Sequence, residues 1–273
     1  MKKNIPFKKM HGSGNDFILV DNRQHLVPRD EASRVAVRFC KRHFGIGADG
    51  LILVEDSDIA DFRWQFFNAD GSRADMCGNG GRCAARFAVL LGICKPELKF
   101  ETGAGIIEAS VKNSTVKLQL TPPKDLKAGM QITVHDRQRR VDFINTGVPH
   151  AVLFPADLEA EPVFETGRII RHHKHFSPEG TNVNFVKVNG PSSILIRTYE
   201  RGVEDETFAC GTGAVASALI SGLKGLVEPP VEVTTWGGEK LKVYFRKEEA
   251  PDFKKVYLEG KAILVYSGFT EEI

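Results

Sequence analysis

Short runs of apolar residues, bounded by Gly, Pro, Asn or Asp, recur along the chain. This pattern is typical of strands separated by turns. It predicts strands at 17–20, 51–54, 62–67, 98–101, 106–111 and 116–120 in the first half, and at 151–154, 183–188, 194–200 and 231–235 in the second. Residues 10–16 are predicted to form a turn.

Helical periodicity, with apolar or small residues at i, i+3, i+4 and i+7, occurs in two runs and gives each run one apolar face. The residues concerned are Ala84, Phe87, Ala88 and Leu91 in the first run, and Val215, Ala218, Leu219 and Gly222 in the second. Two further helices are predicted. One begins at Asp30 and ends in a basic last turn at 41–43, and the other covers about 166–175.

The order of elements in the first half returns in the second half. Four landmarks recur at a nearly constant separation: 135 residues from Asn15 to His150, 133 from Gly47 to Gly180, 133 from Cys77 to Cys210, and 134 from Gly103 to Gly237. A constant separation is the signature of an internal repeat. The chain is therefore predicted to contain two copies of a mixed α/β unit, packed face to face about a pseudo-twofold axis.

A stretch with two prolines, at 121–125, separates the two copies, because proline does not fit a central strand. We predict an N-terminal domain over 1–123, which carries Cys77, and a C-terminal domain over 124–261, which carries Cys210. A C-terminal strand at about 262–273 is predicted to return to the N-terminal domain. A length of 273 residues suits two domains of ordinary size.

The composition is that of an ordinary globular protein, with 42% hydrophobic and 26% charged residues and a formal net charge of +2. The chain has no basic block and no apolar stretch near the roughly 18 residues of a membrane span, so neither nucleic acid nor a membrane is an expected partner. Its basic start lacks the apolar core of a signal peptide, so a cytoplasmic location is expected. Five cysteines without C-x-x-C spacing disfavour both disulfides and a structural zinc site.

Two cysteines stand in the same local sequence. Cys77 precedes Gly-Asn-Gly-Gly and Cys210 precedes Gly-Thr-Gly, in each case at the start of a predicted helix. The unpaired N–H groups and positive dipole end of a helix N-terminus favour anions, so they are expected to lower the thiol pKa and to attract a carboxylate. A buried cysteine is often only a small apolar residue, but two matching sites favour chemistry. Cys40, Cys83 and Cys94 are expected to pack in the core without a chemical role.

Two thiols on opposite sides of one carbon can invert a stereocentre. One, as a thiolate, removes the α-proton of an amino acid, and the other, as a thiol, delivers a proton to the opposite face. Two helix N-termini directed at the α-carboxylate would stabilise the carbanion in a dry cleft. Neither pyridoxal nor a metal is then required, so no cofactor is expected. This chemistry requires that Cys77 and Cys210 face each other across one cleft.

The longer motifs of the chain closely resemble those of the diaminopimelate epimerase family. They are residues 12–17 (GSGNDF), 67–72 (FNADGS), 76–83 (MCGNGGRC), 148–150 (VPH), 181–183 (TNV), 199–202 (YERG) and 209–213 (ACGTG). The resemblance implies an α+β fold of two similar domains, each with a curled, mostly antiparallel sheet around a central helix. It also implies a homodimer that interconverts LL- and meso-diaminopimelate without a cofactor, on the bacterial route to lysine and peptidoglycan.

The resemblance further implies roles for individual residues. Cys77 and Cys210 match the acid/base pair, while His150 and Glu200 match positions that tune the thiols. The residues that match substrate-binding positions are Asn15, Asn68, Gly78, Asn79, Asn182, Glu200, Arg201, Gly211 and Thr212. Among these, Arg201 offers a two-pronged contact for a carboxylate.

Two positions depart from the commoner family pattern. Gly50 stands where many members have a glutamine, and Val148 stands where many have an asparagine before Pro-His. Each change removes an amide that could contact substrate. A racemase of the same mechanism that acts on another amino acid therefore stays open. A non-catalytic module that binds amino acids or small anions is the alternative of a different class, and it would need the helix N-termini but not the thiols.

Two other patterns have plainer interpretations. Residues 211–216 fit the dinucleotide-binding pattern G-x-G-x-x-A, but acidic residues, not an apolar strand, precede them. The cluster of His172, His173 and His175 could suggest a metal site. In the last turn of a basic helix, however, these histidines are expected to complement the helix dipole in solvent.

Overall fold

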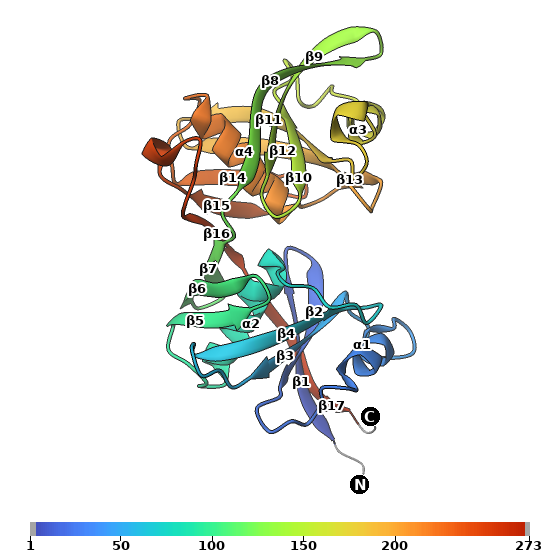
Figure 1. Cartoon of the computed structure of the whole chain (residues 1–273), viewed down its shortest axis with the longest axis vertical. Helices are drawn as coiled ribbons and strands as arrows, with labels where there is room; N and C mark the ends of the chain where they lie inside the picture. Colours follow the sequence, from blue (N-terminus) through green and yellow to red (C-terminus); the bar gives the residue numbers. More distant parts are fainter. Residues whose placement is uncertain (1–3, 271–273) are drawn as a thin grey trace. The chain divides into compact units, whose positions relative to one another are not determined.

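The computed structural model describes residues 4–270. Contacts divide the chain into two units (Figure 1), which are described separately below. The first unit comprises Met1–Gln119 and Glu259–Ile273, and the second comprises Leu120–Leu258. The last part of the predicted C-terminal strand, residues 271–273, lies outside the described residues.

The first unit contains two helices and a mostly antiparallel set of strands. The strands are β1 (Ile5–Gly12), β2 (Asn15–Asp21), β3 (Gly50–Glu55), β4 (Phe62–Asn68), β5 (Glu97–Thr102), β6 (Gly105–Lys112), β7 (Thr115–Leu120) and β17 (Ile263–Thr270), and the helices are α1 (Ala32–Cys40) and α2 (Gly78–Leu90). In the described part of this unit, the pairs β2–β3 and β4–β5 are parallel, and the pairs β1–β17, β1–β2, β3–β4, β5–β6 and β6–β7 are antiparallel. Parallel neighbours need a crossover connection, and α1 and α2 supply the two crossovers.

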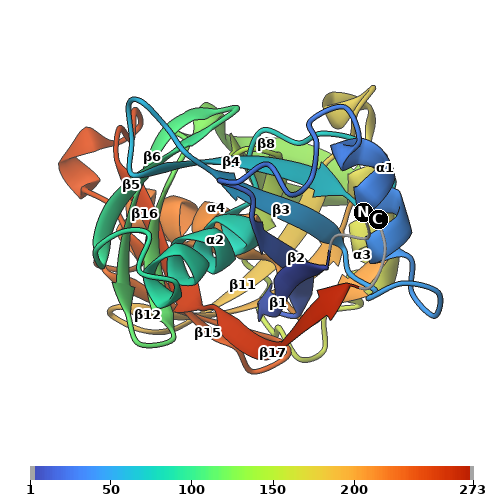
Figure 2. The same cartoon turned by 90° about the horizontal axis from the view of Figure 1, so that it is seen from below.

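Helix α2 is the core helix of the first unit. It contacts β1, β2, β3 and β6 (Figure 2), while α1 packs on β3 and β4. The residues of α2 that are buried are mostly small: Gly80, Gly81, Arg82, Cys83, Ala84, Ala85, Phe87 and Ala88. Small side chains let the surrounding strands approach the helix closely, which explains why a glycine-rich and alanine-rich sequence lies here.

One of these residues carries a charge: Arg82, which is fully buried. Its guanidinium donates to Ser13 Oγ at 2.9 Å, to Asn79 Oδ1 at 2.8 Å and to the carbonyl of Lys261 at 3.5 Å. One turn later, Arg86 donates to the carbonyl of Ala262. Two arginines of α2 therefore bind the segment that leads into β17, and β17 then pairs antiparallel with β1.

The second unit repeats this plan. Its elements are β8 (Lys124–Val134), β9 (Arg137–Asn145), β10 (Pro149–Leu153), α3 (Val163–Arg171), a 3₁₀ turn (Lys174–Phe176), β11 (Asn182–Gly190), β12 (Ser193–Glu200), β13 (Asp205–Thr207), α4 (Gly211–Leu223), β14 (Val231–Thr235), β15 (Lys240–Tyr244), a second 3₁₀ turn (Lys247–Glu249) and β16 (Val256–Lys261), which runs on into the first unit. The parallel pairs are β10–β11, across α3, and β12–β14, across α4. The other pairs are antiparallel.

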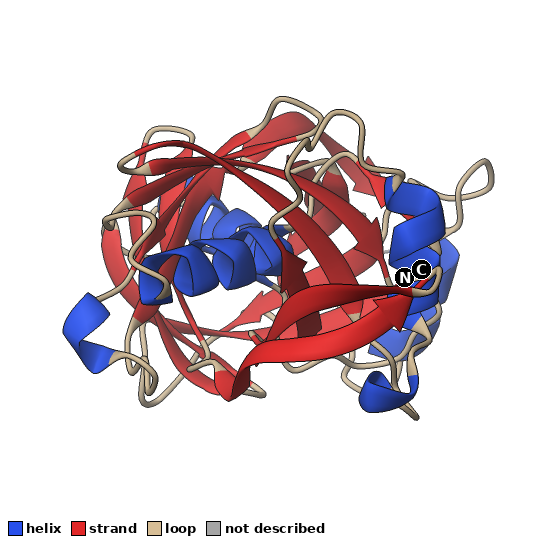
Figure 3. Ribbon diagram, turned by 90° about the horizontal axis from the view of Figure 1, so that it is seen from above, coloured by secondary structure: helices blue, strands red, loops and turns tan. Residues whose placement is uncertain are grey.

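Helix α4 takes the place in the second unit that α2 takes in the first. It contacts β9, β10, β11, β12, β14 and β15, and every residue from Gly213 to Gly222 is buried. Figure 3 shows helices in blue with red strands around them. A helix that is apolar on all sides belongs in an interior, and the sequence of α4 fits that rule. The predicted fold class, two similar domains with a curled sheet around a central helix, is confirmed.

Several predicted boundaries are wrong. Residues 10–12 belong to β1 and residues 15 and 16 to β2, so the turn is confined to Ser13 and Gly14. Helix α1 ends at Cys40 because Lys41 is extended, so residues 41–43 lie beyond it. Helix α3 ends at Arg171 and His173 is extended, so His173 and His175 are not in its last turn. Within residues 4–270 no helix is both long and apolar enough to cross a membrane.

The contacts of Arg82 lead to a prediction about stability. Replacement of Arg82 by methionine keeps the apolar stem but leaves the partly buried acceptors of Ser13, Asn79 and Lys261 without this donor. We expect the free energy of unfolding to fall by about 2–4 kcal/mol, measured by urea denaturation followed by circular dichroism. The control is Arg34→Met, because Arg34 is 76% exposed and pairs only with neighbouring Glu31; it should change stability by less than about 0.5 kcal/mol. Equal effects of the two substitutions would contradict the assigned role.

Candidate functional site

Cys77 is the N-cap residue of α2, with φ −147° and ψ 120°. Its sulfur accepts a hydrogen bond from the amide N–H of Gly80 at 3.4 Å and donates to Asn15 Oδ1 at 3.7 Å. Asn79 Nδ2 also donates to Asn15 Oδ1, at 3.4 Å. The structure therefore brings together four of the predicted residues, Asn15, Cys77, Gly78 and Asn79, at the first turn of α2.

Asn15 is hydrogen-bonded to a network of charged side chains. Asn15 Nδ2 donates to Asp49 Oδ2 at 2.7 Å, and Arg42 donates to Asp49 at 3.0 Å and to Asp16 at 2.8 Å. Lys9, which is buried, pairs with Asp16 at 2.7 Å. Although burial raises the pKa of Asp16, the hydrogen bonds from Lys9 and Arg42 hold it below the ordinary value. This network was not predicted; its sequence signal is the pair of aspartates, Asp16 at the start of β2 and Asp49 just before β3.

Cys210 is the N-cap residue of α4, with φ −135° and ψ 108°, close to the backbone conformation of Cys77. It is 7% exposed, and its sulfur lies 3.7 Å from Thr212 Oγ1. The carbonyl of Thr212 accepts from Thr146 Oγ1 at 3.0 Å, which fixes the first turn of α4 to the end of β9. Gly211 and Thr212 therefore form the first turn here, as Gly78 and Asn79 do in α2.

Glu200, at the end of β12, interacts electrostatically with Cys210. Its Oε2 accepts a hydrogen bond from Thr207 Oγ1 at 2.9 Å. Burial raises the pKa of Glu200 above the ordinary value, against the lowering by the Thr207 hydroxyl. Burial first, and then the negative charge of Glu200, raise the pKa of Cys210 to about 12.

The expectation that a helix N-terminus lowers the thiol pKa is wrong for both cysteines. Burial also raises the pKa of Cys77, and the amide N–H groups of Gly80 and Asn79 only partly offset it. A buried thiolate loses the hydration that stabilises it in water, and this loss exceeds the gain from a few amide donors. Both thiols are therefore protonated at neutral pH in these units.

The second unit also gathers His150, Asn182 and Arg201. His150 of β10 pairs in parallel register with Asn182 of β11. The side chain of Asn182 accepts from the backbone N–H of Arg201 at 2.9 Å and donates to the carbonyl of Pro149 at 3.0 Å. The guanidinium of Arg201 donates to the carbonyl of Glu179 at 3.3 Å. Asn182 thus fixes the backbone from which Arg201 extends.

Asn68 lies at the end of β4, and its Nδ2 donates to Ser72 Oγ at 2.9 Å. This bond belongs to the turn that leads toward Cys77 and does not join Asn68 to the thiol. In strand register, Asn68 pairs with Gly50. A Cβ at Gly50 would lie 2.6 Å from a ring carbon of Phe66 and 2.8 Å from the carbonyl oxygen of Phe67. The ring of Phe66 therefore fills the space that a longer side chain at position 50 would need.

Strand register corrects one landmark of the repeat. Phe17 pairs with Gly50 in the first unit as His150 pairs with Asn182 in the second. His150 is therefore the counterpart of Phe17, and Asn15 is the counterpart of Val148. The repeat in the sequence matched Asn15 of the first half with His150 of the second half, because both residues follow a glycine-containing turn.

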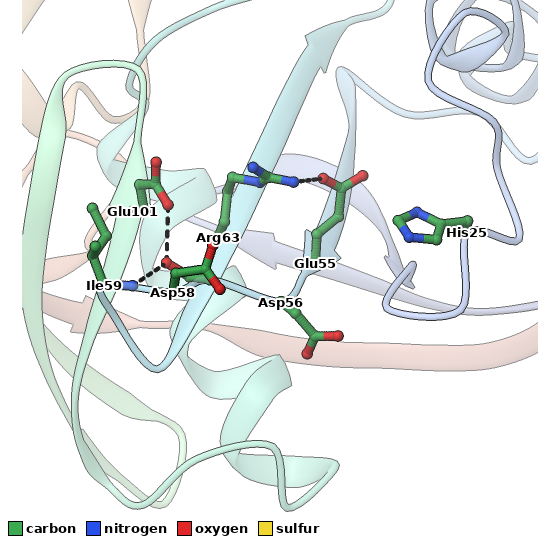
Figure 4. A pocket seen from close by; sticks show the side chains of 8 residues that line it. His25, Glu55, Asp56, Asp58, Ile59, Arg63 and Glu101 are labelled. Carbon is green, nitrogen blue, oxygen red and sulfur yellow. Dashed lines mark hydrogen bonds and ion pairs between the residues drawn. The ribbon is translucent and has the colours of Figure 1, made fainter.

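A pocket of about 370 Å³ in the first unit contains none of the predicted site residues (Figure 4). It is lined by His25, Glu55, Asp56, Ser57, Asp58, Ile59, Arg63 and Glu101. Arg63 pairs with Glu55 at 2.9 Å, and Ser57 donates to Glu101 at 2.9 Å.

Across residues 4–270, no group of three or more His, Cys, Asp or Glu side chains is arranged to hold a metal ion. The rings of His173 and His175 contact each other at 4.8 Å between centroids.

Comparison with protein families gives one match, to a family described as diaminopimelate epimerase, over residues 7–125 and 143–265. The chain is 48% identical to the diaminopimelate epimerase of Aquifex aeolicus over 98% of its own length and 99% of that protein. It is 46% identical to that of Chlorobaculum tepidum, over 95% and 98% of the two chains. An archaeal relative of the same description, from Archaeoglobus fulgidus, is 43% identical over 97% and 95%.

Solved structures with low sequence identity share the fold. A phenazine biosynthesis protein of the PhzF family from Bacillus anthracis gives a TM-score of 0.74 at 17% identity, over 98% of this chain and 99% of that one. A hydroxyproline epimerase from Agrobacterium vitis, with trans-4-hydroxy-L-proline bound, gives 0.71 at 16% identity, over 99% and 94%.

The raised thiol pKa values lead to a prediction about reactivity. Because Glu200 raises the pKa of Cys210, Glu200→Gln should lower it and increase the thiolate fraction at any pH below about 12. We expect alkylation of Cys210 by iodoacetamide at pH 9 to become about three- to tenfold faster, a pKa fall of about half a unit to one unit. Mass spectrometry of the Cys210 peptide measures the rate. In the control, Asp205→Asn, an exposed carboxylate is removed from β13, and the rate should not change. A slower reaction of Glu200→Gln would contradict the coupling.

Proposed function

Because the chain belongs to the diaminopimelate epimerase family, it is an isomerase, and we propose that it interconverts LL- and meso-diaminopimelate with Cys77 and Cys210 as the two acid/base groups. The observation that carries this proposal is the repeated geometry of the thiols. Each is the N-cap of the central helix of its unit, with nearly the same φ and ψ. Duplication of the unit would explain why the central helix occurs twice. It would not by itself require a cysteine at the N-cap of both helices.

In the proposed reaction one cysteine, as a thiolate, takes the proton from the α-carbon and becomes a thiol. The other, a thiol, gives its proton to the opposite face of the same carbon and becomes a thiolate. The amide N–H groups of Gly78 and Asn79, and of Gly211 and Thr212, stabilise the negative charge that develops on the carboxylate. The reverse reaction exchanges the two roles, and the reaction consumes no cofactor.

The same family resemblance supports roles for the surrounding residues. Asn15, whose Oδ1 accepts from both Cys77 and Asn79, positions the first thiol and contacts substrate. Glu200 accepts the proton of Cys210 when that thiol must become a thiolate, since its raised pKa brings it closer to that of the thiol. Arg201 binds the distal carboxylate of the substrate, with Asn68 and Asn182 completing the contacts.

The test is proton exchange in deuterated water. We expect LL-diaminopimelate to incorporate deuterium at its α-carbon, and Cys77→Ala and Cys210→Ala each to reduce the rate by about a thousandfold or more, as expected for loss of an acid/base group. Cys94→Ala is the matched control, because Cys94 is a free, partly buried thiol outside both motifs, and it should retain activity.

The substrates distinguish the alternatives. Turnover of amino acids with a single carboxylate, but not of diaminopimelate, would replace this proposal by a racemase with another substrate. Binding of diaminopimelate without any α-proton exchange would support the non-catalytic module.

We also propose that the chain forms homodimers and acts in the cytoplasm. Exposed apolar side chains on β17 support the first proposal: Phe269 is 73% exposed and Val265 is 55% exposed. Monomers seldom expose such groups together without a partner. The five cysteines, all free thiols, support the second, because a reducing compartment keeps thiols from pairing.

Light scattering coupled to gel filtration tests the dimer. We expect twice the 30.2 kDa mass of the chain for the wild type and a shift toward the monomer for Phe269→Glu, because a carboxylate in an apolar interface loses its hydration. Ile59→Glu is the control, since Ile59 is 66% exposed on a different surface loop. A wild-type protein with the mass of one chain would refute the homodimer.

A further inference from the structure

A buried polar network lies in the second unit under the first turn of α4. It joins His150 of β10, Asn184 of β11 and Thr198 of β12, which are 0%, 0% and 2% exposed. By strand register, their counterparts in the first unit are Phe17, Ile52 and Phe66. The first unit therefore builds the same fold with apolar side chains at these places. Since burial of polar groups opposes folding unless each is hydrogen-bonded, the network calls for a functional explanation.

The orientation of the Asn184 amide follows from its neighbours. One atom of the amide lies 3.1 Å from the carbonyl oxygen of Ala151, and the other lies 3.0 Å from Thr198 Oγ1. A backbone carbonyl can only accept, so the amide nitrogen must face Ala151. The amide oxygen then accepts from the hydroxyl of Thr198. The Ala151 carbonyl selects this orientation, and the Thr198 hydroxyl, which can donate as well as accept, is compatible with it.

This orientation fixes the proton on His150. The nitrogen of Asn184 also lies 3.1 Å from His150 Nδ1, and an amide NH₂ group only donates. His150 Nδ1 must therefore accept, with its lone pair, and the neutral ring carries its proton on Nε2. Burial, and then the positive charge of Arg201, lower the pKa of His150 to about 3, so the ring is neutral at physiological pH.

The protonated nitrogen has no partner within the described residues. His150 Nε2 is buried and makes no hydrogen bond there. A buried donor left unpaired costs stability, and such groups in native proteins are usually satisfied by a ligand or water. The network also lies next to Cys210, because a Cβ at Gly213 would overlap Asn184 Oδ1 and lie 3.2 Å from the sulfur of Cys210. The unpaired donor thus belongs to the neighbourhood of the proposed reaction.

We infer that Asn184 is a positioning residue, which holds His150 in the Nε2–H tautomer so that Nε2 donates a hydrogen bond to an anionic acceptor, a carboxylate or thiolate, of the reacting complex. This inference rests on the proposed function. In this tautomer Nε2 has no lone pair to take up a proton, so His150 acts as a donor and does not serve as a general base through that atom. In this inference Asn184 acts through His150 and not on the substrate.

The tautomer can be observed directly, without substrate. In protein labelled with ¹⁵N-histidine, long-range ¹H–¹⁵N spectra distinguish the protonated from the unprotonated ring nitrogen. The chain has eight histidines, and comparison with His150→Gln identifies the signals of His150. We expect Nε2 to be protonated and Nδ1 unprotonated in the wild type. Protonated Nδ1 in the wild type would overturn the inference, whatever the variants do.

Asn184→Asp tests the cause. A carboxylate accepts where the amide donated, so it should move the proton of His150 to Nδ1. We expect kcat for deuterium exchange to fall on the order of tenfold or more, as for other residues that hold a histidine in one tautomer, with a smaller change in KM. The control is Thr198→Val, which removes one anchor of the amide but leaves Ala151, and the wild-type tautomer should persist.

The outcomes separate this inference from the proposed function. If Asn184→Asp folds and reverses the tautomer while kcat stays at the wild-type value, the positioning role is refuted and the epimerase proposal stands. If the wild type exchanges no α-proton of diaminopimelate, the proposed function fails, and the spectra still test the hydrogen bonds. An unchanged ring signal in folded Asn184→Asp would refute the role of Asn184 alone.

Discussion

The first turn of a buried helix is the constraint on which both units depend. A helix enclosed by strands must bury its N-terminal N–H groups, and these have no carbonyl partner within the helix. At α2 the sulfur of Cys77 accepts from one of them, the N–H of Gly80. At α4 Cys210 holds the same cap position next to Thr212. The remaining donors favour an anion, so the atoms that cap the buried helix are also the atoms that the proposed reaction uses.

The two units share a backbone plan but differ in polarity. In the first, the charged network from Lys9 through Asp16, Arg42 and Asp49 supports Asn15 at the edge of the site, and the strands under α2 carry aromatic rings. In the second, polar side chains lie under the helix itself, where Glu200 raises the pKa of Cys210. The two units therefore differ in the groups that they place around their central helices.

The repeat, the core helices and most strands could be predicted from the sequence, because apolar runs and glycine-rich turns depend on residues that are close together in the chain. Strands at the edge of the sheet were harder to predict. For example, β8 is largely exposed, so much of its sequence does not alternate between apolar and polar residues as that of a half-buried strand does. The thiol pKa values could not be predicted, since the N-cap position is visible in the sequence and the burial that outweighs it is not. Asn184 directly follows a recognised motif, residues 181–183, and only strand register shows that it takes the place of an isoleucine of the other unit.

The return of the chain to β1 has a consequence for biosynthesis. Ile5 pairs with Thr270, so a segment synthesised before the second unit and a segment synthesised after it are neighbours in one sheet. The strands β8 to β15 of the second unit all lie between these two segments. Synthesis of the second unit is therefore finished before synthesis of the first unit is. During translation the N-terminal half must therefore persist with an open sheet border, a state in which unpaired strands are prone to aggregate, until the final segment emerges and closes it.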